Sequence, residues 1–431
     1  NEAWQLAIHQ GNSWVARKIH DNEVVYIPNN FLMDKVDLND KETWKIEPKQ
    51  VERAIKDGRH DAKNPIFNWR KVVAQESVRH ERWNANRNVL AWKFLTGVEY
   101  NDPEKFPYSA VIDRKLGVKD AMALLRLHED YIGQDQELYH SKSEGICRTT
   151  SHDSIVYNLT ADPTLTEAWK TLGRPCQSVF VPLYPLAGPA KGTAFTDPAT
   201  ATKEHFAGTP AMFDYRADFT PHSVFSASNN AIDYLRGDEL AKRTQLIQAE
   251  EDKFMKDRAA VTKKAAGLKG EERTKFLHDY NQKSYDHVLK IMQAENARLM
   301  PNKVKILADV VKADGDGTVD FALLGAKGHE VLSANMEATR AGMSANQLNS
   351  TRQWKNFAPA EKMVYKDVNN DGITDVVFTF KAKDVTKGAV AGAAMDLWLY
   401  TQINGHRVTG FDVVPVENDK VKMNKGARDG K

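Results

Sequence analysis

Hydrophobic and polar side chains alternate in the opening stretch of the chain. Trp4, Leu6 and Ile8 alternate with small or polar residues, and a second alternating run extends from residue 13 to residue 19. The Gln-Gly-Asn segment between the two runs contains a glycine of the kind found in tight turns. This pattern predicts a β-hairpin. Strands need neighbours, so we expect another segment or chain to pair with it.

Helices and further strands are predicted in the same part of the chain. Apolar side chains at helical spacing predict helices at residues 48–58 and 117–133. Alternating runs predict strands at residues 24–27, 154–159 and 178–183. We therefore expect an α+β domain over residues 1–230, with a Gly- and Pro-rich loop at residues 184–200.

The pattern changes twice further along the chain. Residues 231–300 are mostly helix formers divided at Gly267 and Gly270, which predicts a long hairpin of two helices that belongs to the first domain or packs on it. Residues 301–417 contain short alternating runs separated by turn residues, with no helix expected between them, and this predicts a β-sandwich. A polar tail follows at residues 418–431.

Composition excludes some classes of function. The chain of 431 residues is long enough for two or three domains. Its 60 basic and 58 acidic residues are interspersed and give a formal charge of +2, so no nucleic-acid-binding surface is indicated. The sequence has no apolar run of the length that spans a membrane.

A possible metal site lies in DVNNDGITD, residues 367–375. Side-chain oxygens occur at loop positions typical of calcium sites, and these belong to Asp367, Asn369, Asp371 and Asp375. Ile373 can add a backbone carbonyl, and Phe378 stands where a glutamate ligand is usual, so Asp314 or Asp316 would have to complete the set. The sequence is compatible with two interpretations, a loop that binds a structural calcium ion and a simple Asp-Gly turn. Neither interpretation predicts a catalytic cofactor.

The two cysteines, Cys147 and Cys176, do not have the spacing of metal ligands. They lie on either side of a predicted hairpin, which would bring them close enough for a disulfide in an oxidising compartment. Two buried thiols are the alternative.

Two groups of residues in the first domain could take part in catalysis. Ser151, His152 and Asp153 follow Cys147 and form a Ser-His-Asp string, but adjacent residues of a strand point to opposite faces and cannot readily form a triad. Asn29 and Asn30, in IPNNF, stand at the end of a predicted strand. An asparagine amide there could donate to an oxyanion, although asparagine is also common in turns.

Three stretches of the first domain resemble a known family. NEAWQLAIHQGNSWVARKIHDNEVVYIPNNF, RTTSHDSIVYNL and EAWKTLGRPCQSVFVPLYP resemble, in this order, the dipeptidase and secernin family of N-terminal-nucleophile hydrolases. The resemblance implies an αββα sandwich and hydrolysis of the amide bond of dipeptides. It also implies an N-terminal cysteine nucleophile, exposed by removal of a propeptide, whose α-amino group is the base.

The nucleophile of that family precedes the matching stretches, and residue 1 of this chain is asparagine. We therefore expect an incomplete αββα sandwich, completed by an upstream fragment of the same precursor that carries an N-terminal cysteine. The chain would then be the large subunit or a processed fragment of a two-chain hydrolase. An inactive remnant is the alternative.

The resemblance implies roles for three residues. Asn29 matches the asparagine after the family's Ile-Pro-Asn pattern and is expected in the oxyanion hole. Arg148 and His152 fall in an arginine-containing segment and are expected to orient the small peptide substrate.

The C-terminal block, from about residue 302 to residue 416, resembles immunoglobulin-like domains appended to secreted bacterial enzymes, in DGDGTVDFALLGA and KDVNNDGITDVVFTF. This resemblance implies a secreted or periplasmic protein.

The leading prediction is thus an exported, dipeptidase-like cysteine amide hydrolase that needs its upstream segment for activity. A binding or scaffold protein that retains the fold without the chemistry is the alternative from another class. A hydrolase that uses Cys147 and His152 by itself is a third possibility.

Overall fold

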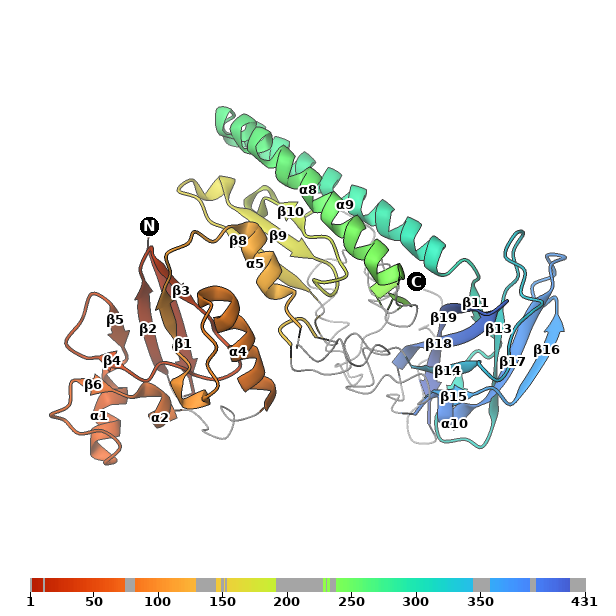
Figure 1. Ribbon diagram of the computed structural model, residues 1–431, viewed down its shortest axis with the longest axis horizontal. Coiled ribbons are helices and arrows are strands. Elements are labelled where there is room, and N and C mark those ends of the chain that lie inside the picture. The colour runs from red at the N-terminus through yellow and green to blue at the C-terminus, as the bar shows by residue number, and fades with distance from the viewer. Residues whose placement is uncertain are drawn as a thin grey trace. The chain divides into compact units, whose positions relative to one another are not determined.

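The computed structural model describes residues 2–10, 12–73, 82–128, 145–148, 151, 153–190, 228–229, 231–232, 238–343, 357–387 and 393–418. The chain divides into two compact units. The first comprises Asn1–Asp130 and Ser143–Arg148, and the second comprises Tyr131–Lys142 and Thr149–Lys431. Both units mix helices with several sheets (Figure 1), which confirms the α+β class.

The predicted hairpin opens the first unit. Strand β1 (Ala3–His9) pairs antiparallel with β2 (Ser13–Ile19), and β2 pairs with β5 (Trp44–Ile46) in the order β1-β2-β5. Asn12 takes a left-handed φ of 62° at the turn, a conformation that asparagine tolerates. Strand β1 is the edge of this sheet, and it exposes the apolar side chains of Leu6 and Ile8 by 54% and 64%. The hairpin is confirmed, and its outer edge bears no strand in the described part of the chain.

Two short strand pairs and four helices make up the rest of the described part of the first unit. Strand β3 (Glu23–Val25) pairs with β7 (Ser109–Val111), and β4 (Val36–Asp37) pairs with β6 (Ile66–Phe67). The helices are α1 (Pro48–Lys56), α2 (Trp69–Val73), α4 (Arg82–Thr96) and α5 (Val118–Leu125), and a 3₁₀ turn forms at Pro103–Lys105. One apolar cluster joins the hairpin side to α2 through Val15, Trp44 and Trp69, and a second joins α4 to β3 and β7 through Trp92, Leu95 and Val24.

Two elements of this unit are shorter than predicted. Strand β3 ends at Val25 rather than at Ile27, because its partner β7 pairs with it only as far as Val25. Helix α5 ends at Leu125, and the carbonyl of Leu127 accepts a hydrogen bond from the Cys147 N–H at 3.0 Å. The last residues of the predicted helix, 129–133, lie outside the described part.

In the second unit, a small sheet packs on a long helical hairpin. Strands β8 (Ser154–Asn158), β9 (Glu167–Thr171) and β10 (Val181–Leu183) form the sheet, with 3₁₀ turns at Pro163–Leu165 and Pro185–Ala187. Helices α8 (Asp238–Gly267) and α9 (Gly270–Leu299) form the predicted hairpin and lie along this sheet (Figure 1), with Tyr184 and Leu277 in the shared core. Strand β10 starts later than predicted, since the N–H of Phe180 donates to the Glu251 carboxylate at 2.8 Å instead of pairing with a strand.

Two sheets enclose a common core in the C-terminal part. One has the order β11-β13-β17-β16, with bounds Val304–Ile306, Thr318–Leu323, Asp375–Lys381 and Lys362–Lys366. The other has the order β12-β19-β18-β14-β15, with bounds Val311–Lys312, His406–Glu417, Ala393–Ile403, Arg340–Met343 and Ala358–Pro359. Side chains from both sheets meet in one core, which includes Phe321, Phe378 and Leu397. The expectation of no helix is wrong in one place, because the short α10 (Ala382–Val385) follows β17.

The domain boundaries expected near residues 230 and 301 stay predictions, and residues 419–431 of the tail lie outside the described part. No described helix is both long enough and apolar enough to cross a lipid bilayer.

Candidate active site

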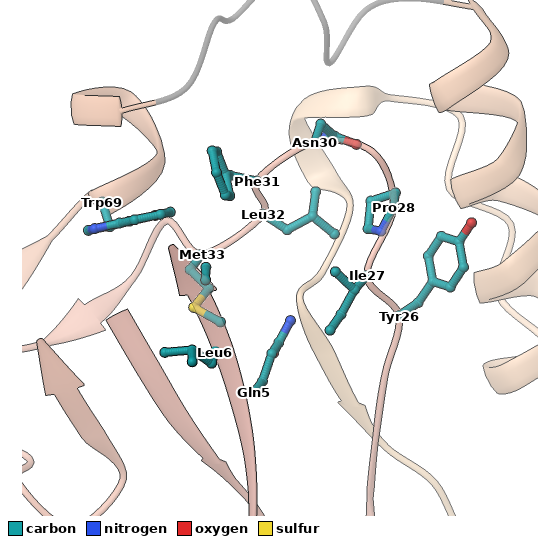
Figure 2. Close-up of a pocket in the computed structure, with 11 residues that line it drawn as sticks. Gln5, Leu6, Tyr26, Ile27, Pro28, Asn30, Phe31, Leu32, Met33 and Trp69 are labelled. Atoms are coloured by element: carbon teal, nitrogen blue, oxygen red, sulfur yellow. The ribbon is translucent and has the colours of Figure 1, made fainter. Parts of the chain in front are cut away.

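The segment YIPNNFLM, residues 26–33, leaves β3 and passes over β1, where it encloses a small cavity (Figure 2). The cavity measures about 30 Å³, which is room for little more than a water molecule or a small chemical group. Most of its wall is apolar, with Ile27, Leu32 and Met33 from the segment, Leu6 from β1 and Trp69 from α2. This apolar wall makes the cavity a place where a polar contact is strong.

Two buried amides line the cavity. Gln5 is only 6% exposed, and its Oε1 atom has no hydrogen-bond partner in the described residues. Both amide atoms of Asn30 are buried and likewise lack a partner there. Figure 2 shows Gln5 rising from β1 towards the segment and Asn30 at the top of it. Buried polar groups are nearly always satisfied in proteins, so these amides mark a place for a water molecule or a polar ligand group.

Asn29 is held by an arginine of helix α4. The Nη1 group of Arg87 donates to Asn29 Oδ1 at 3.0 Å, and Arg87 is 6% exposed. Because a guanidinium has only donors, this bond fixes which end of the asparagine amide is the carbonyl. The Asn29 Nδ2 group has no hydrogen-bond acceptor in the described part of the chain, and Asn29 itself is exposed. The amide therefore presents its donor end to an incoming group.

A second positive charge lies near Arg87, the partner of Asn29. Burial, and secondly the charge of Arg148, lowers the pKa of Arg87, while Tyr26 acts in the opposite sense. Burial raises the pKa of the Tyr26 hydroxyl to about 12, so this neighbour is neutral at ordinary pH. Two arginines and a neutral phenol give a positive potential, which favours a ligand atom that carries or develops negative charge.

The candidate catalytic and substrate-binding residues predicted from the sequence lie in different parts of the structure. Asn29 and Arg148 lie in the first unit, where both act on Arg87. His152 lies outside the described residues. Asp153 forms an ion pair with Lys170, which is consistent with the expectation that the Ser-His-Asp string is no triad. Their roles in substrate binding stay predictions.

Cys147 and Cys176 are thiols in the structure, and Cys147 is buried with 1% exposure. Of the two alternatives that the sequence leaves open, the structure thus has the thiols rather than the disulfide.

Arg87 and Gln5 were missed by the sequence analysis, which did name Asn30, beside Asn29, as a possible oxyanion donor. A signal for Arg87 exists, because Arg87, Ala91 and Leu95 follow one another at helical spacing and are all buried. An arginine at a core-facing position of a helix is unusual unless it has a specific partner.

The predicted calcium loop is closed by its own backbone. The Asp367 carboxylate accepts from the N–H groups of Asp371 and Gly372 at 3.3 and 2.9 Å, and Asp371 accepts from the Ile373 N–H at 2.8 Å. Bonding to the Gly372 N–H is the main cause of the lowered pKa of Asp367.

Asp375 has different surroundings from the other acidic residues of the loop. It is completely buried and accepts from the N–H groups of Gly325 and Val368, both at 2.8 Å. These contacts make it a structural anchor that ties the start of β17 to the segments that follow β13 and β16. Calcium binding by Asp367, Asn369, Asp371, Asp375 and the Ile373 carbonyl stays a prediction.

Comparisons with known proteins support a peptidase. Residues 1–206 match the model of Peptidase family C69. The matched region includes Asn29, Arg87 and Arg148. These findings support the dipeptidase family that the sequence resembles.

One curated relative is similar to part of the chain. A probable dipeptidase of Latilactobacillus sakei is 23% identical over 194 residues, which cover 43% of this chain and 41% of the relative. The chain thus spans about two fifths of the length of that relative. Together the comparisons support a dipeptidase-like hydrolase.

Proposed function

We propose that the chain is part of a hydrolase that cleaves the amide bond of a dipeptide, with the Asn29 side chain stabilising the oxyanion. The observation that carries this proposal is the hydrogen bond from Arg87 to Asn29 Oδ1, which directs the Asn29 Nδ2 group outward as a donor. The dipeptidase resemblance and the match of residues 1–206 to a peptidase family support it. In the proposed reaction a thiolate attacks the carbonyl carbon, the carbonyl oxygen becomes negative, and Asn29 Nδ2 donates to it.

We further propose that the thiolate belongs to an N-terminal cysteine outside this chain, on an upstream fragment of the same precursor. The family resemblance implies such a cysteine, and its α-amino group would take the thiol proton and pass it to the leaving amine. The acyl group is then held as a thioester, which water cleaves to release the acid and restore the thiol. The burial of Cys147 makes that thiol a poor alternative nucleophile. The open edge of β1, with Leu6 and Ile8 exposed, offers a strand of the fragment a place to pair. An N-terminal-nucleophile sandwich completed in this way is part of the proposal.

Mutation of Asn29 tests the proposed function. In the protein isolated together with its upstream fragment, we expect Asn29→Ala to lower kcat for a dipeptide by about a hundredfold or more, with little change in KM, as removal of one oxyanion donor does elsewhere. Asn101→Ala, at another exposed asparagine, is the matched control and should leave kcat unchanged. Wild-type turnover in the Asn29→Ala variant would contradict the role of Asn29.

The partner is tested separately. Denaturing electrophoresis of the native preparation should show a second polypeptide whose first residue is cysteine. Hydrolysis by a preparation of this chain alone would contradict the two-chain proposal. A preparation with both polypeptides and no hydrolysis would favour the scaffold protein instead. Export to the periplasm or the medium is part of the same proposal and rests on the resemblance of the C-terminal block.

A further inference from the structure

A groove of about 550 Å³ lies in the second unit, between the β8–β9 hairpin and helix α8. Its volume is typical of small-molecule sites. No step of the proposed hydrolysis uses it. Residues of both elements line it, among them Asn158, Thr160, Met255, Arg258, Thr262 and Lys263.

A buried carboxylate anchors one side of the groove. The side chain of Glu167 is 3% exposed, and Arg258 Nε lies 2.7 and 2.9 Å from its two oxygens. Asn158 Nδ2 and Trp169 Nε1 also donate to Glu167, at 3.2 and 3.3 Å. A carboxylate with this many donors is fully engaged within the protein. Its role is to hold Arg258 in place rather than to bind a ligand itself.

Arg258 has donors left over. Only its Nε atom bonds to Glu167, and the described residues offer no acceptor to the two terminal nitrogens. The side chain is 33% exposed and lines the groove. The fork of two terminal nitrogens is the part of arginine that binds a carboxylate or phosphate through two parallel hydrogen bonds. Because Glu167 fixes the Arg258 side chain through Nε, the two terminal nitrogens are already positioned for such a ligand.

The charges at the groove indicate what kind of anion fits. Arg258 and the exposed Lys263 are positive, and Glu167 is negative, so these three lining side chains have one net positive charge. That charge matches a single carboxylate better than a doubly charged phosphate. Met255 and Ala259 add an apolar surface on the same helix, and Asn158 and Thr160 add polar groups opposite.

We propose that this groove binds a small organic carboxylate. The carboxylate bonds to the terminal nitrogens of Arg258 and is attracted by Lys263, while the apolar part of the ligand packs on Met255 and Ala259. A free amino acid derivative or the C-terminal end of a short peptide has this combination of groups. The groove is lined by residues of the second unit, whereas Asn29 and Arg87 belong to the first unit.

Calorimetric titration of the full chain tests the proposal with three probes. N-acetyl-leucine has both the carboxylate and an apolar side chain, N-acetyl-leucine amide lacks the charge, and inorganic phosphate lacks the apolar part. We expect saturable binding of N-acetyl-leucine, at least tenfold weaker binding of the amide, and weaker binding of phosphate than of N-acetyl-leucine. Binding of the amide as tight as that of the acid, or binding of phosphate alone, would overturn the proposal.

Variants assign the binding to this groove. Arg258→Gln should weaken N-acetyl-leucine binding at least tenfold, and Lys263→Gln should weaken it severalfold. Lys256→Gln, at an exposed lysine of α8 outside the lining of the groove, is the matched control and should bind as the wild type does.

Arg258 also pairs with Glu167, so its loss could unfold the unit, and a melting curve is needed for each variant. Arg258→Lys keeps a positive charge near Glu167 but removes the fork, and it should lose affinity about as Arg258→Gln does. Wild-type affinity in both Arg258→Lys and Lys263→Gln would show that the ligand binds elsewhere.

Discussion

Replacement of Asp375 tests whether this residue is a structural anchor in its own right. Its carboxylate is fully buried at the start of β17 and accepts one hydrogen bond from Gly325 and one from Val368. In Asp375→Ala both N–H groups lose their acceptor. A hydrogen bond to a charged group contributes roughly 1.5–3 kcal/mol, and an unsatisfied buried donor costs about 1–3 kcal/mol. These two figures are alternative estimates of the same loss and are not added. For the two bonds together we expect about 3–6 kcal/mol of destabilisation.

Asp375→Asn should cost less than the alanine variant but more than a surface change. The asparagine carbonyl can accept from one N–H group, and its NH₂ group then faces the other donor. The matched control is Glu361→Ala, which removes a carboxylate that is 41% exposed and pairs with Lys381 at 3.0 Å. Exposed ion pairs contribute about 0–1 kcal/mol, so this variant should unfold almost as the wild type does.

Hydrogen exchange of the β13 and β17 amides in the full chain measures this effect locally. The exchange free energy of these amides should fall in the order Glu361→Ala, Asp375→Asn, Asp375→Ala, in calcium and in chelator alike. Protection equal to the wild type in Asp375→Ala would refute the anchoring role. A loss that appears in calcium only would show that Asp375 acts as a metal ligand instead.

Three further predictions concern the other sites. Arg87→Met keeps much of the side-chain volume but removes the hydrogen bond to Asn29, so the Asn29 amide is able to turn. This variant should lower kcat of the assembled hydrolase with little effect on KM, and an unchanged kcat would contradict the positioning role of Arg87. The raised pKa of Tyr26, about 12 against an ordinary 10.0, means that it stabilises the fold below pH 10 and that this contribution is lost as the pH rises towards 12; Tyr26→Phe should reduce the fall in stability over that range, as followed by denaturant unfolding. Calcium should raise the Tm of the C-terminal sheets if Asp367, Asn369 and Asp371 bind it, and identical melting curves in calcium and chelator would remove the site.

Local patterns predicted most of the regular structure. The opening hairpin and the α8–α9 hairpin follow from periods of two and of about 3.6 residues, and both are found at the expected places. The errors lie at the ends of helices and strands, where a hydrogen bond to a residue distant in sequence determines the last residue of the element. The N–H of Phe180 bonds to a side chain of α8, and the carbonyl of Leu127 bonds to Cys147. Contacts between residues far apart in sequence are not visible in a local pattern.

The candidate site was predicted only in part for the same reason. Asn29 was found because it is embedded in a stretch that resembles a family. Its partner Arg87 is 58 residues away in the sequence and on a different element. The pair therefore exists only in the folded unit, and no spacing along the chain indicates it.

Helix α4 nevertheless has a feature that sequence analysis can use. Along its buried face, Asn84, Arg87 and Asn88 occupy the same stripe as Ala91, Trp92 and Leu95. A helix that only packed would carry apolar side chains at all of these positions. Polar side chains in such a stripe cost free energy unless each has a defined partner. For Arg87 one partner is the side-chain carbonyl of Asn29. This one hydrogen bond accounts for the arginine on the buried face of α4, and it also leaves the Asn29 NH₂ group as a donor.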